Sequence, residues 1–443
     1  MISRILTLTF LSVLLLAPSA CGTSAQPTAD STGSPRNIFT PQDRLVCVDY
    51  FVWYQGFDGR HPEYGPSTRA RVWRPTYVNT RIFGDDDDFP SPPRRDTWPE
   101  ATDVNWYVAN FRAMAYARID ICFIDIWAQV LFRPADGGDL TPLGRKTLTA
   151  LIRAWDFLER RGEAPPRLAF FLDIFGSSTT DIATDRGNPD GWRVLYQHIE
   201  PIFRQFYHPE GIGASIGDRA LALMKDEKGL RPMLAIFMPR TGPIWWTVAW
   251  SQGSFTETKA AFKNDPAYGF DPYMIVCQHL HDGEIGGGWN DPQKDGRSVV
   301  ISGPGGVVED DVRWFSQVGG PLVSRHQKNT ISISTGHWTI TDEPKMPGGG
   351  HYPKAHHYNG PDDPTSRYED DWREVLDGKH FAQRLLFIET YNELDEGNNL
   401  VPCVPRTVEI DGKFVDRWGD SPEVYLELTR KYAPYWKQAK ALR

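Results

Sequence analysis

Residues 384–400, RLLFIETYNELDEGNNL, place a short apolar run directly before a group of carboxylate and amide side chains. The run at residues 385–388 is bounded by polar residues, which predicts a buried strand. Glu393 and Glu396 follow it, three positions apart, so their Cα atoms lie at most about 10 Å from each other. The stretch therefore predicts a strand that delivers two carboxylates to its carboxyl end, close enough to flank one bond of a substrate.

Apolar, β-rich runs recur along the chain with helical patterns between them, which is typical of repeated βα units. The predicted strands are residues 45–53, 119–127, 167–174, 233–238, 273–278, 298–302, 330–334 and 385–391. Their nearly continuous hydrophobicity indicates burial on both faces. Eight parallel strands close into a barrel that leaves no edge, so the sequence predicts an α/β protein formed by a single (β/α)8 TIM barrel.

Helical spacing of apolar residues is clearest over residues 103–118, 147–161 and 421–438, and a weaker helix is predicted over residues 308–318. Two long segments without periodicity, residues 55–100 and 337–371, follow the first and the seventh predicted strand. In a barrel these segments leave the carboxyl-terminal face, where active sites are built. We therefore expect long βα loops that wall a substrate site.

The amino terminus carries Arg4, an apolar core over residues 5–17 and small residues before Cys21, which is a secretory signal pattern. Residues 18–21, PSAC, resemble the lipobox of bacterial lipoproteins, with Pro18 in place of the usual aliphatic residue. We predict a signal peptide at residues 1–20, lipid attachment at Cys21 with a flexible tether at residues 21–43, and the barrel domain at residues 44–443. The expected location is periplasmic or cell-surface, anchored by the lipid; ordinary cleavage and full secretion is the alternative.

Composition limits the partners. The formal net charge of −9 argues against nucleic acid. Cys47, Cys122 and Cys277 lie in apolar runs without the spacing of a zinc site, which favours buried thiols. Aromatic residues make up 13% of the chain and include 16 Trp, several of them in loops or at strand ends, where flat apolar faces suit sugar rings as well as a core. We expect a monomer without a cofactor that contacts a membrane only through its lipid.

Acidic and aromatic residues end several predicted strands, and charged groups so close to buried strands are costly unless they are paired or used. For a lone Asp, including Asp49 and Asp173, a salt bridge or a loop cap is the alternative. The candidate substrate-binding residues are Trp53, Asp125, Trp127, His279, Tyr391 and Asn392.

A concentration of histidines falls in the second long loop. His351, His356 and His357 lie near Asp362 and Asp363, but their spacing matches no strong ligand motif. We therefore predict no metal site and expect polar contacts to the substrate from this loop.

Residues 389–397, ETYNELDEG, are similar to the Trp-Asn-Glu-Trp-His-Glu-Gly run of the glycoside hydrolase family 99 endo-α-mannosidases. The wider relatives of that family include family 71 α-glucanases and family-99-like lipoproteins. Residues 49–54 and 119–127 are compatible with the family's first two strands, and residues 425–432 continue the resemblance weakly. Tyr391, Leu394 and Asp395 stand in place of the family's Trp, Trp and His. By this resemblance, Leu394 and Asp395 alter positions that contact the sugar and so bear on mannose specificity.

The resemblance implies a retaining endo-glycosidase. In it, Glu393 would act as a base on the sugar 2-hydroxyl and assist an epoxide-type intermediate, and Glu396 would be general acid and then base. Independently of the family, protonating a leaving oxygen near neutral pH needs a carboxyl with a raised pKa, and a neighbouring carboxylate raises it.

The sequence thus predicts a glycoside hydrolase that acts on a polysaccharide or glycan. Two alternatives stay open. One is a non-catalytic, glycan-binding surface lipoprotein on the same barrel, whose acids only hydrogen-bond hydroxyls. The other is a metal-dependent hydrolase that uses the His-rich loop.

Overall fold

The computed structural model describes sixteen stretches of the chain: residues 37–52, 74–75, 79–85, 89–90, 102–127, 140–173, 191–238, 252–279, 308–314, 322–323, 329–335, 367–393, 398–404, 407–410, 413–416 and 421–442. All of them belong to one compact unit that spans Pro35–Arg443. Cys21, the predicted signal peptide and most of the predicted tether lie outside these stretches. Over the stretches described, no helix is long and apolar enough to cross a membrane.

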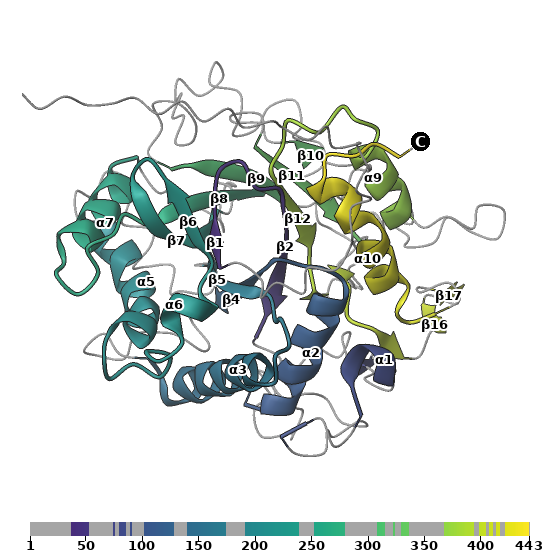
Figure 1. Cartoon of the computed structure of the whole chain (residues 1–443), viewed down its shortest axis with the longest axis horizontal. Coiled ribbons are helices and arrows are strands. Elements are labelled where there is room, and N and C mark those ends of the chain that lie inside the picture. The colour runs from purple at the N-terminus through teal and green to yellow at the C-terminus, as the bar shows by residue number, and fades with distance from the viewer. Residues whose placement is uncertain are drawn as a thin grey trace, which may run out of the picture. The chain divides into compact units, whose positions relative to one another are not determined.

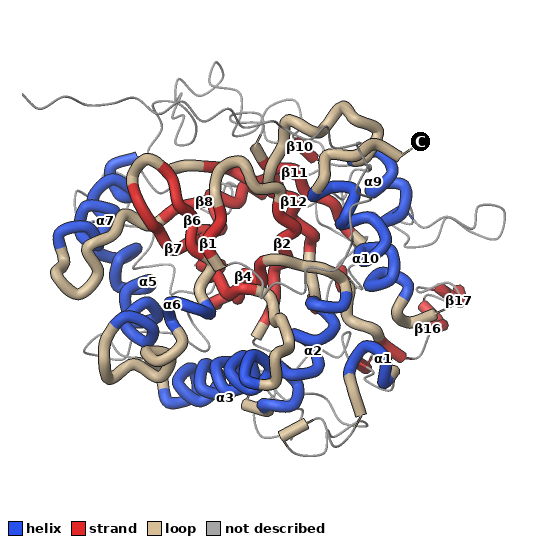
Figure 2. Tube along the Cα trace, in the orientation of Figure 1, coloured by secondary structure: helices blue, strands red, loops and turns tan. Residues whose placement is uncertain are grey.

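Eight parallel strands of the described chain form a ring around the centre of the unit (Figures 1 and 2). In chain order they are β2 (Leu45–Phe51), β4 (Ile121–Trp127), β5 (Arg167–Asp173), β7 (Gly229–Met238), β8 (Tyr273–His279), β9 (Asp310–Trp314), β11 (Thr330–Ser334) and β12 (Leu385–Glu389). Consecutive strands pair in parallel from β2 to β9 and from β11 to β12. The last strand, β12, pairs with the first, β2, and β9 lies beside β11. This is the predicted (β/α)8 barrel.

Helices surround the ring (Figure 1). The longer ones are α2 (Val104–Tyr116), α3 (Pro142–Arg160), α5 (Gly191–Tyr207), α7 (Gln252–Asn264), α9 (Arg367–Val375) and α10 (Val424–Lys437), and the short ones are α1 (Thr80–Phe83) and α6 (Gly217–Ala220). The remaining strands are β1 (Ile38–Phe39), β3 (Arg74–Pro75), β6 (Leu223–Asp226), β10 (Leu322–Val323), β13 (Asn392–Glu393), β14 (Asn398–Asn399), β15 (Cys403–Val404), β16 (Thr407–Ile410) and β17 (Lys413–Asp416).

Local signals explain where the predicted helices begin. Asp103 caps α2, because its carboxylate accepts the Asn105 N–H at 2.9 Å. For α3 the cap is Thr141, followed by Pro142 in the first turn. This helix therefore begins five residues earlier than the apolar spacing from residue 147 indicates.

Side chains along each barrel strand point alternately into the barrel and outward toward the helices, so the core has an inner and an outer layer. Side chains such as Cys47, Phe123 and Phe387 fill the inside of the barrel, where the rings of Phe123 and Phe387 lie 5.2 Å apart. Their neighbours along the strands, such as Val46 and Val48, pack outward with the helices. The inner layer also includes residues from β1 and β6, which pair with each other and, through β6, with the start of β7. These short strands close the amino-terminal end of the barrel.

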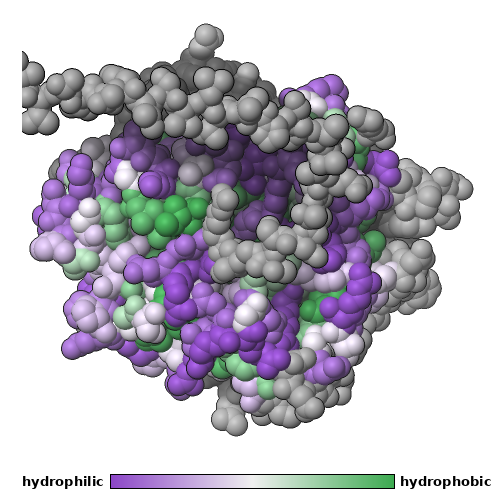
Figure 3. Space-filling model, viewed as in Figure 1, coloured by the Kyte–Doolittle hydropathy of each residue, from purple (hydrophilic) through white to green (hydrophobic). Residues whose placement is uncertain are grey.

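Exposed apolar surface lies at this closed end. Ile38 on β1 is 40% exposed and Leu230 on β7 is 46% exposed, the two large hydrophobic side chains that stand out among the residues described. The face drawn in Figure 3 is mostly hydrophilic, with an apolar area over the place that β6 and β7 occupy in Figure 1.

The sixth barrel strand is not where the sequence placed it. The predicted strand at residues 298–302 lies outside the described stretches, and the predicted helix at residues 308–318 is wrong where it can be compared, because Asp310–Trp314 forms β9. This strand runs parallel to β8, with Ile275 opposite Asp310 and His279 opposite Trp314. Asp310, the first residue of this strand, is held by a group distant in sequence: the Tyr273 hydroxyl donates to its carboxylate.

The residue before β9, Glu309, sits in a buried ion cluster. Its carboxylate accepts bonds from Lys259 Nζ at 2.7 and 2.8 Å, from Arg231 Nη1 at 2.6 Å and from the Met274 N–H at 2.8 Å. The Arg231 side chain is only 1% exposed. Three barrel segments, β7, β8 and the start of β9, are therefore joined by one carboxylate.

Candidate active site

Three carboxylates face into the barrel near the carboxyl ends of adjacent strands. Asp49 on β2, Asp125 on β4 and Glu389 on β12 are 1%, 1% and 0% exposed. Each is two residues after an inward-facing core residue, so alternation directs it inward as well. The last barrel strand, β12, pairs with the first, β2, and we call this pairing the seam. Because Ile388 lies opposite Val48, Glu389 lies next to Asp49 across the seam. Such burial is costly for charge unless partners offset it, and each of the three carboxylates has interaction partners in the structure.

Hydroxyl groups continue this polar layer on β11. Ser332 and Ser334 alternate with Ile331 and Ile333, which pack in the outer core, and Ser334 pairs with Glu389. Both serines are buried, at 0% and 2% exposed. Neither serine was predicted as a site residue, although the pattern TISIS at residues 330–334 places serines on one face of a strand whose other face is apolar.

Beyond β12 the chain forms a hairpin that is fastened to the barrel. The Glu389–Thr390 peptide bond is cis, and the Tyr391 N–H donates to the Asp49 carbonyl at 2.7 Å. Strands β13 and β14 then pair antiparallel, with Glu393 opposite Asn398. At the base of the hairpin, the Tyr391 carbonyl accepts the N–H groups of residues 400 and 401 at 2.8 and 2.9 Å.

The hairpin carries both predicted catalytic residues. Glu393 lies on β13, where the structure describes its backbone. Glu396 belongs to residues 394–397, which connect the two strands and lie outside the described stretches, as does the Glu393 side chain. The position of the hairpin directly after the eighth barrel strand agrees with the predicted carboxyl-terminal mouth; the catalytic roles stay predictions.

Asn392 and Tyr391 occupy buried positions at the base of this hairpin. The Asn392 carboxamide accepts the Phe51 N–H at 2.8 Å and donates to the Phe51 carbonyl at 2.7 Å, with 2% of the residue exposed. The Tyr391 ring is 0% exposed and lies 5.6 Å from the ring of Tyr50, in the outer core. These positions favour structural roles, and sugar contacts by either residue stay untested predictions.

The other predicted substrate contacts are only partly visible. Trp127 and His279 are the last residues of β4 and β8, so their backbones lie at the carboxyl end of the barrel, but their side chains fall outside the described part. Trp53 lies outside the described stretches, one residue past their first segment. Asp125 is the one contact of this group whose side chain the structure places at the mouth.

No metal centre is found in the described part of the chain, where no group of three or more His, Cys, Asp or Glu residues could hold an ion. His351, His356 and His357 fall outside that part. Cys47, Cys122 and Cys277 are buried free thiols, as the sequence predicted, and burial raises the pKa of Cys47 and of Cys122.

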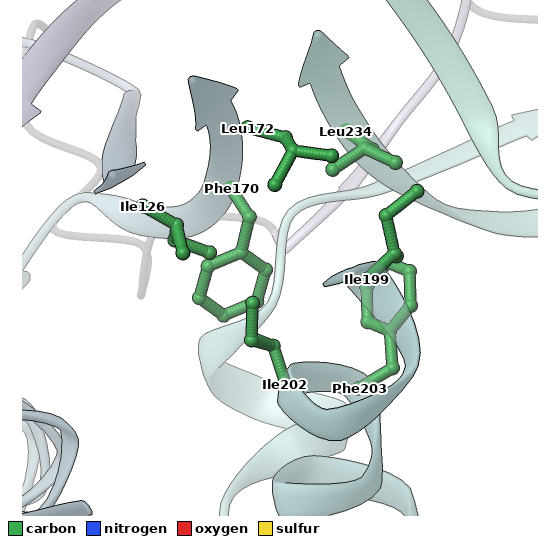
Figure 4. Close-up of a pocket in the computed structure, with 7 residues that line it drawn as sticks. All are labelled: Ile126, Phe170, Leu172, Ile199, Ile202, Phe203 and Leu234. Atoms are coloured by element: carbon green, nitrogen blue, oxygen red, sulfur yellow. The ribbon is translucent and has the colours of Figure 1, made fainter. Parts of the chain in front are cut away.

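An apolar gap lies behind the barrel wall and is separate from this mouth. Figure 4 shows it between β5, β7 and α5, lined only by aliphatic and aromatic side chains, and it leaves no room for a water molecule. Such a gap belongs to the packing of α5 against the sheet, because a substrate site needs polar groups as well.

The structure of this chain is similar to the solved structures of glycoside hydrolases. The GH99 endo-α-mannosidase from Bacteroides thetaiotaomicron matches at 14% identity and a TM-score of 0.48, over 89% of this chain and 98% of that one. The same enzyme in complex with BIS-TRIS-propane gives 14% identity, a TM-score of 0.49 and the same coverage.

A third structure, described as a glycoside hydrolase-like protein, matches at 11% identity and a TM-score of 0.43, over 90% of this chain and 97% of that one. No protein-family model matches the sequence. No curated protein matches it either.

Proposed function

We propose that the chain is a glycoside hydrolase that cleaves glycosidic bonds in a polysaccharide or glycan. One observation carries the proposal: the hairpin that bears Glu393 and Glu396 is anchored at the carboxyl end of the barrel, beside the inward carboxylates of Asp49, Asp125 and Glu389. This end of a barrel is where active sites are built. Carboxylates gathered there suit a transition state in which the sugar carries positive charge.

The proposed reaction is retaining. Glu396 donates a proton to the leaving oxygen and afterwards takes one from the attacking water. Glu393 removes the proton of the sugar 2-hydroxyl, so that this oxygen forms the epoxide-type intermediate and is reprotonated when water opens it. Nearby negative charge supports the acid role, because it favours the protonated form of a carboxyl that must donate near neutral pH.

Separate Glu393→Gln and Glu396→Gln variants test the proposal on a panel of α- and β-linked polysaccharides and oligosaccharides. We expect each to lower kcat at least about 100-fold, the usual order for loss of acid–base catalysis, on any glycan that the parent cleaves. The control is Glu374→Gln on α9, an exposed residue outside the barrel, which should retain parental kcat.

Full activity in both variants would contradict the catalytic roles proposed for Glu393 and Glu396. A parent that binds members of the panel without releasing product would instead select the non-catalytic glycan-binding alternative.

A further inference from the structure

The end of the first barrel strand is held by a side chain where its neighbouring strand has already ended. Backbone pairing between β12 and β2 runs to Ile388 opposite Val48, and the Tyr391 N–H then reaches the Asp49 carbonyl. Beyond this point the Asn392 carboxamide forms hydrogen bonds with both the N–H and the carbonyl of Phe51. On its other side, Phe51 pairs with Asp125 of β4. Asn392 thus completes the seam in place of a peptide group.

The chemistry of this contact is specific. A carboxamide offers an acceptor and a donor in one plane, as a peptide group does, whereas a carboxylate offers acceptors only. The two bonds, at 2.8 and 2.7 Å, join residues 341 positions apart in the sequence, and both are buried. Without Asn392 the Phe51 N–H and carbonyl would be left without these partners in a site that water scarcely reaches, which is costly.

The contact also joins two parts of the predicted site. Asn392 is the first residue of β13 and is directly followed by Glu393. Phe51 is the last residue of β2, two positions before the predicted substrate contact Trp53. One side chain therefore sets the base of the catalytic hairpin against the segment that leads into the first long loop.

We propose that Asn392 is a positioning residue that fixes Glu393 relative to the end of β2, in place of the sugar contact predicted from the sequence. What Glu393 does there rests on the proposed function. The contact itself does not, because it is a property of the fold. Displacing a reacting group by 1 Å costs about 100-fold in rate, so the effect of losing the contact should appear in kcat rather than in KM.

Asn392→Asp is the first test variant, because it keeps the size and the acceptor for the Phe51 N–H but sets an oxygen against the Phe51 carbonyl. We expect kcat to fall about 100-fold, with KM within about threefold of the parent, the pattern of an interaction expressed in the transition state. Asn392→Gln is the second variant, in case the first does not fold. It retains both hydrogen-bonding groups but lengthens the arm by one methylene, and we expect it to fold and to lower kcat less.

Asn110→Asp is the matched control. Asn110 on α2 is 0% exposed, and its Nδ2 donates at 2.8 Å to the hydroxyl of Tyr50, the residue next to Phe51, on the helix side of β2. It should lose a similar amount of thermal stability and keep parental kcat. Equal losses of kcat in the Asn110 and Asn392 variants would overturn the proposal, and so would a raised KM with unchanged kcat, which is the result expected of a sugar contact.

Hydrogen–deuterium exchange followed by mass spectrometry tests the contact without any substrate. In both Asn392 variants we expect faster exchange in peptides covering residues 49–52 and 390–401, and parental rates there in Asn110→Asp. Unchanged exchange in the Asn392 variants would overturn the positioning role. If the parent cleaves no glycan, the proposed function fails, while the exchange result still decides whether Asn392 holds the hairpin to β2.

Discussion

At the scale of single residues, buried polar side chains line the part of the barrel mouth that the structure describes. Asp125 shows this best: it was predicted from its place at a strand end, and the structure puts its carboxylate inside the barrel with 1% exposed. A buried carboxylate at a reaction centre acts at short range in a low dielectric, where it stabilises positive charge more strongly than it would in water.

We therefore expect Asp125→Asn, which keeps the shape and removes the charge, to lower kcat about 10- to 1000-fold, the range found for removing one electrostatic contact in an active site. Steady-state kinetics on a glycan that the parent cleaves measure this. Asp371→Asn is the control, because Asp371 is similarly buried, at 2% exposed, but lies on α9 outside the barrel. Parental kcat in the Asp125 variant would show that this carboxylate serves only the fold.

At the scale of elements, the start of β9 is held in the barrel by an ion cluster around the preceding residue, Glu309. Burial by itself would raise the pKa of Glu309, but Lys259 and Arg231 hold it below its ordinary value of 4.5. A carboxyl whose pKa is lower in the folded than in the unfolded chain stabilises the fold above the unfolded value and loses that contribution as the pH falls through the folded value. The ion cluster should thus support the barrel fully above about pH 4.5 and lose this contribution as the pH falls from there through the lower folded-state pKa of Glu309.

Glu309→Gln removes one carboxylate from the cluster, while Arg231 keeps Asp226 and Asp271 and Lys259 keeps Asp271 as partners. We therefore expect a loss of about 1.5 to 3 kcal/mol in the free energy of unfolding at pH 7, the range for hydrogen bonds to charged groups. Urea denaturation measures it. The loss should shrink as the pH is lowered below 4.5 and through the lower folded-state pKa of Glu309, because the parent's carboxyl is then protonated in the folded chain too. Glu227→Gln, in the exposed turn between β6 and β7, is the control and should be neutral at both pH values. A deficit that stays constant with pH would contradict the assignment.

The same strand shows what local sequence can reveal. β2, β5, β8 and β11 were predicted closely because their apolar side chains report burial by themselves. β9, with the sequence DDVRW, does not. The group that bonds its Asp310 comes from residue 273, and the groups that bond the preceding Glu309 come from residues 231 and 259. At the candidate site, Glu393 and Asp125 were predicted from their place at strand ends, and their roles stay predictions. The contact between Asn392 and Phe51 could not be predicted in this way, because it depends on how the first and the last strand of the barrel lie beside each other.

At the scale of the whole molecule, the carboxyl-terminal helix is fastened to the first barrel strand. The Arg44 side chain donates to the carbonyl of Trp436 at 2.7 Å and to that of Phe381 at 2.6 Å, and its guanidinium lies 3.8 Å from the Trp436 ring centroid. Lys437 bonds Asp120 at 2.6 Å, and Asp120 in turn accepts the Val46 N–H at 2.9 Å. Direct contacts therefore join the two ends of the described chain, and we expect these ends to unfold together.

Arg44→Ala removes two charge-assisted hydrogen bonds and a stacked ring contact, so we expect the free energy of unfolding to fall by about 2 to 4 kcal/mol. Thermal unfolding should shift to lower temperature as a single transition, in far-ultraviolet circular dichroism and in Trp fluorescence alike. Lys379→Ala, which removes an exposed ion pair with Asp377, is the control. If only the fluorescence transition moved, α10 would be detaching by itself and the unit would not be cooperative.

Because β12 pairs with β2, the barrel can close only after its last strand has been synthesised. A ribosome makes Leu45 early and Leu385 late, so the first strand of the barrel waits for most of the polypeptide before its partner exists. That last strand adds Glu389 to the carboxylates of Asp49 and Asp125, and the hairpin and the Asn392 contact with Phe51 follow it in the chain. Nascent chains that stop short of β12 lack Glu393 and Glu396, so the proposed catalytic pair is complete only near the end of synthesis.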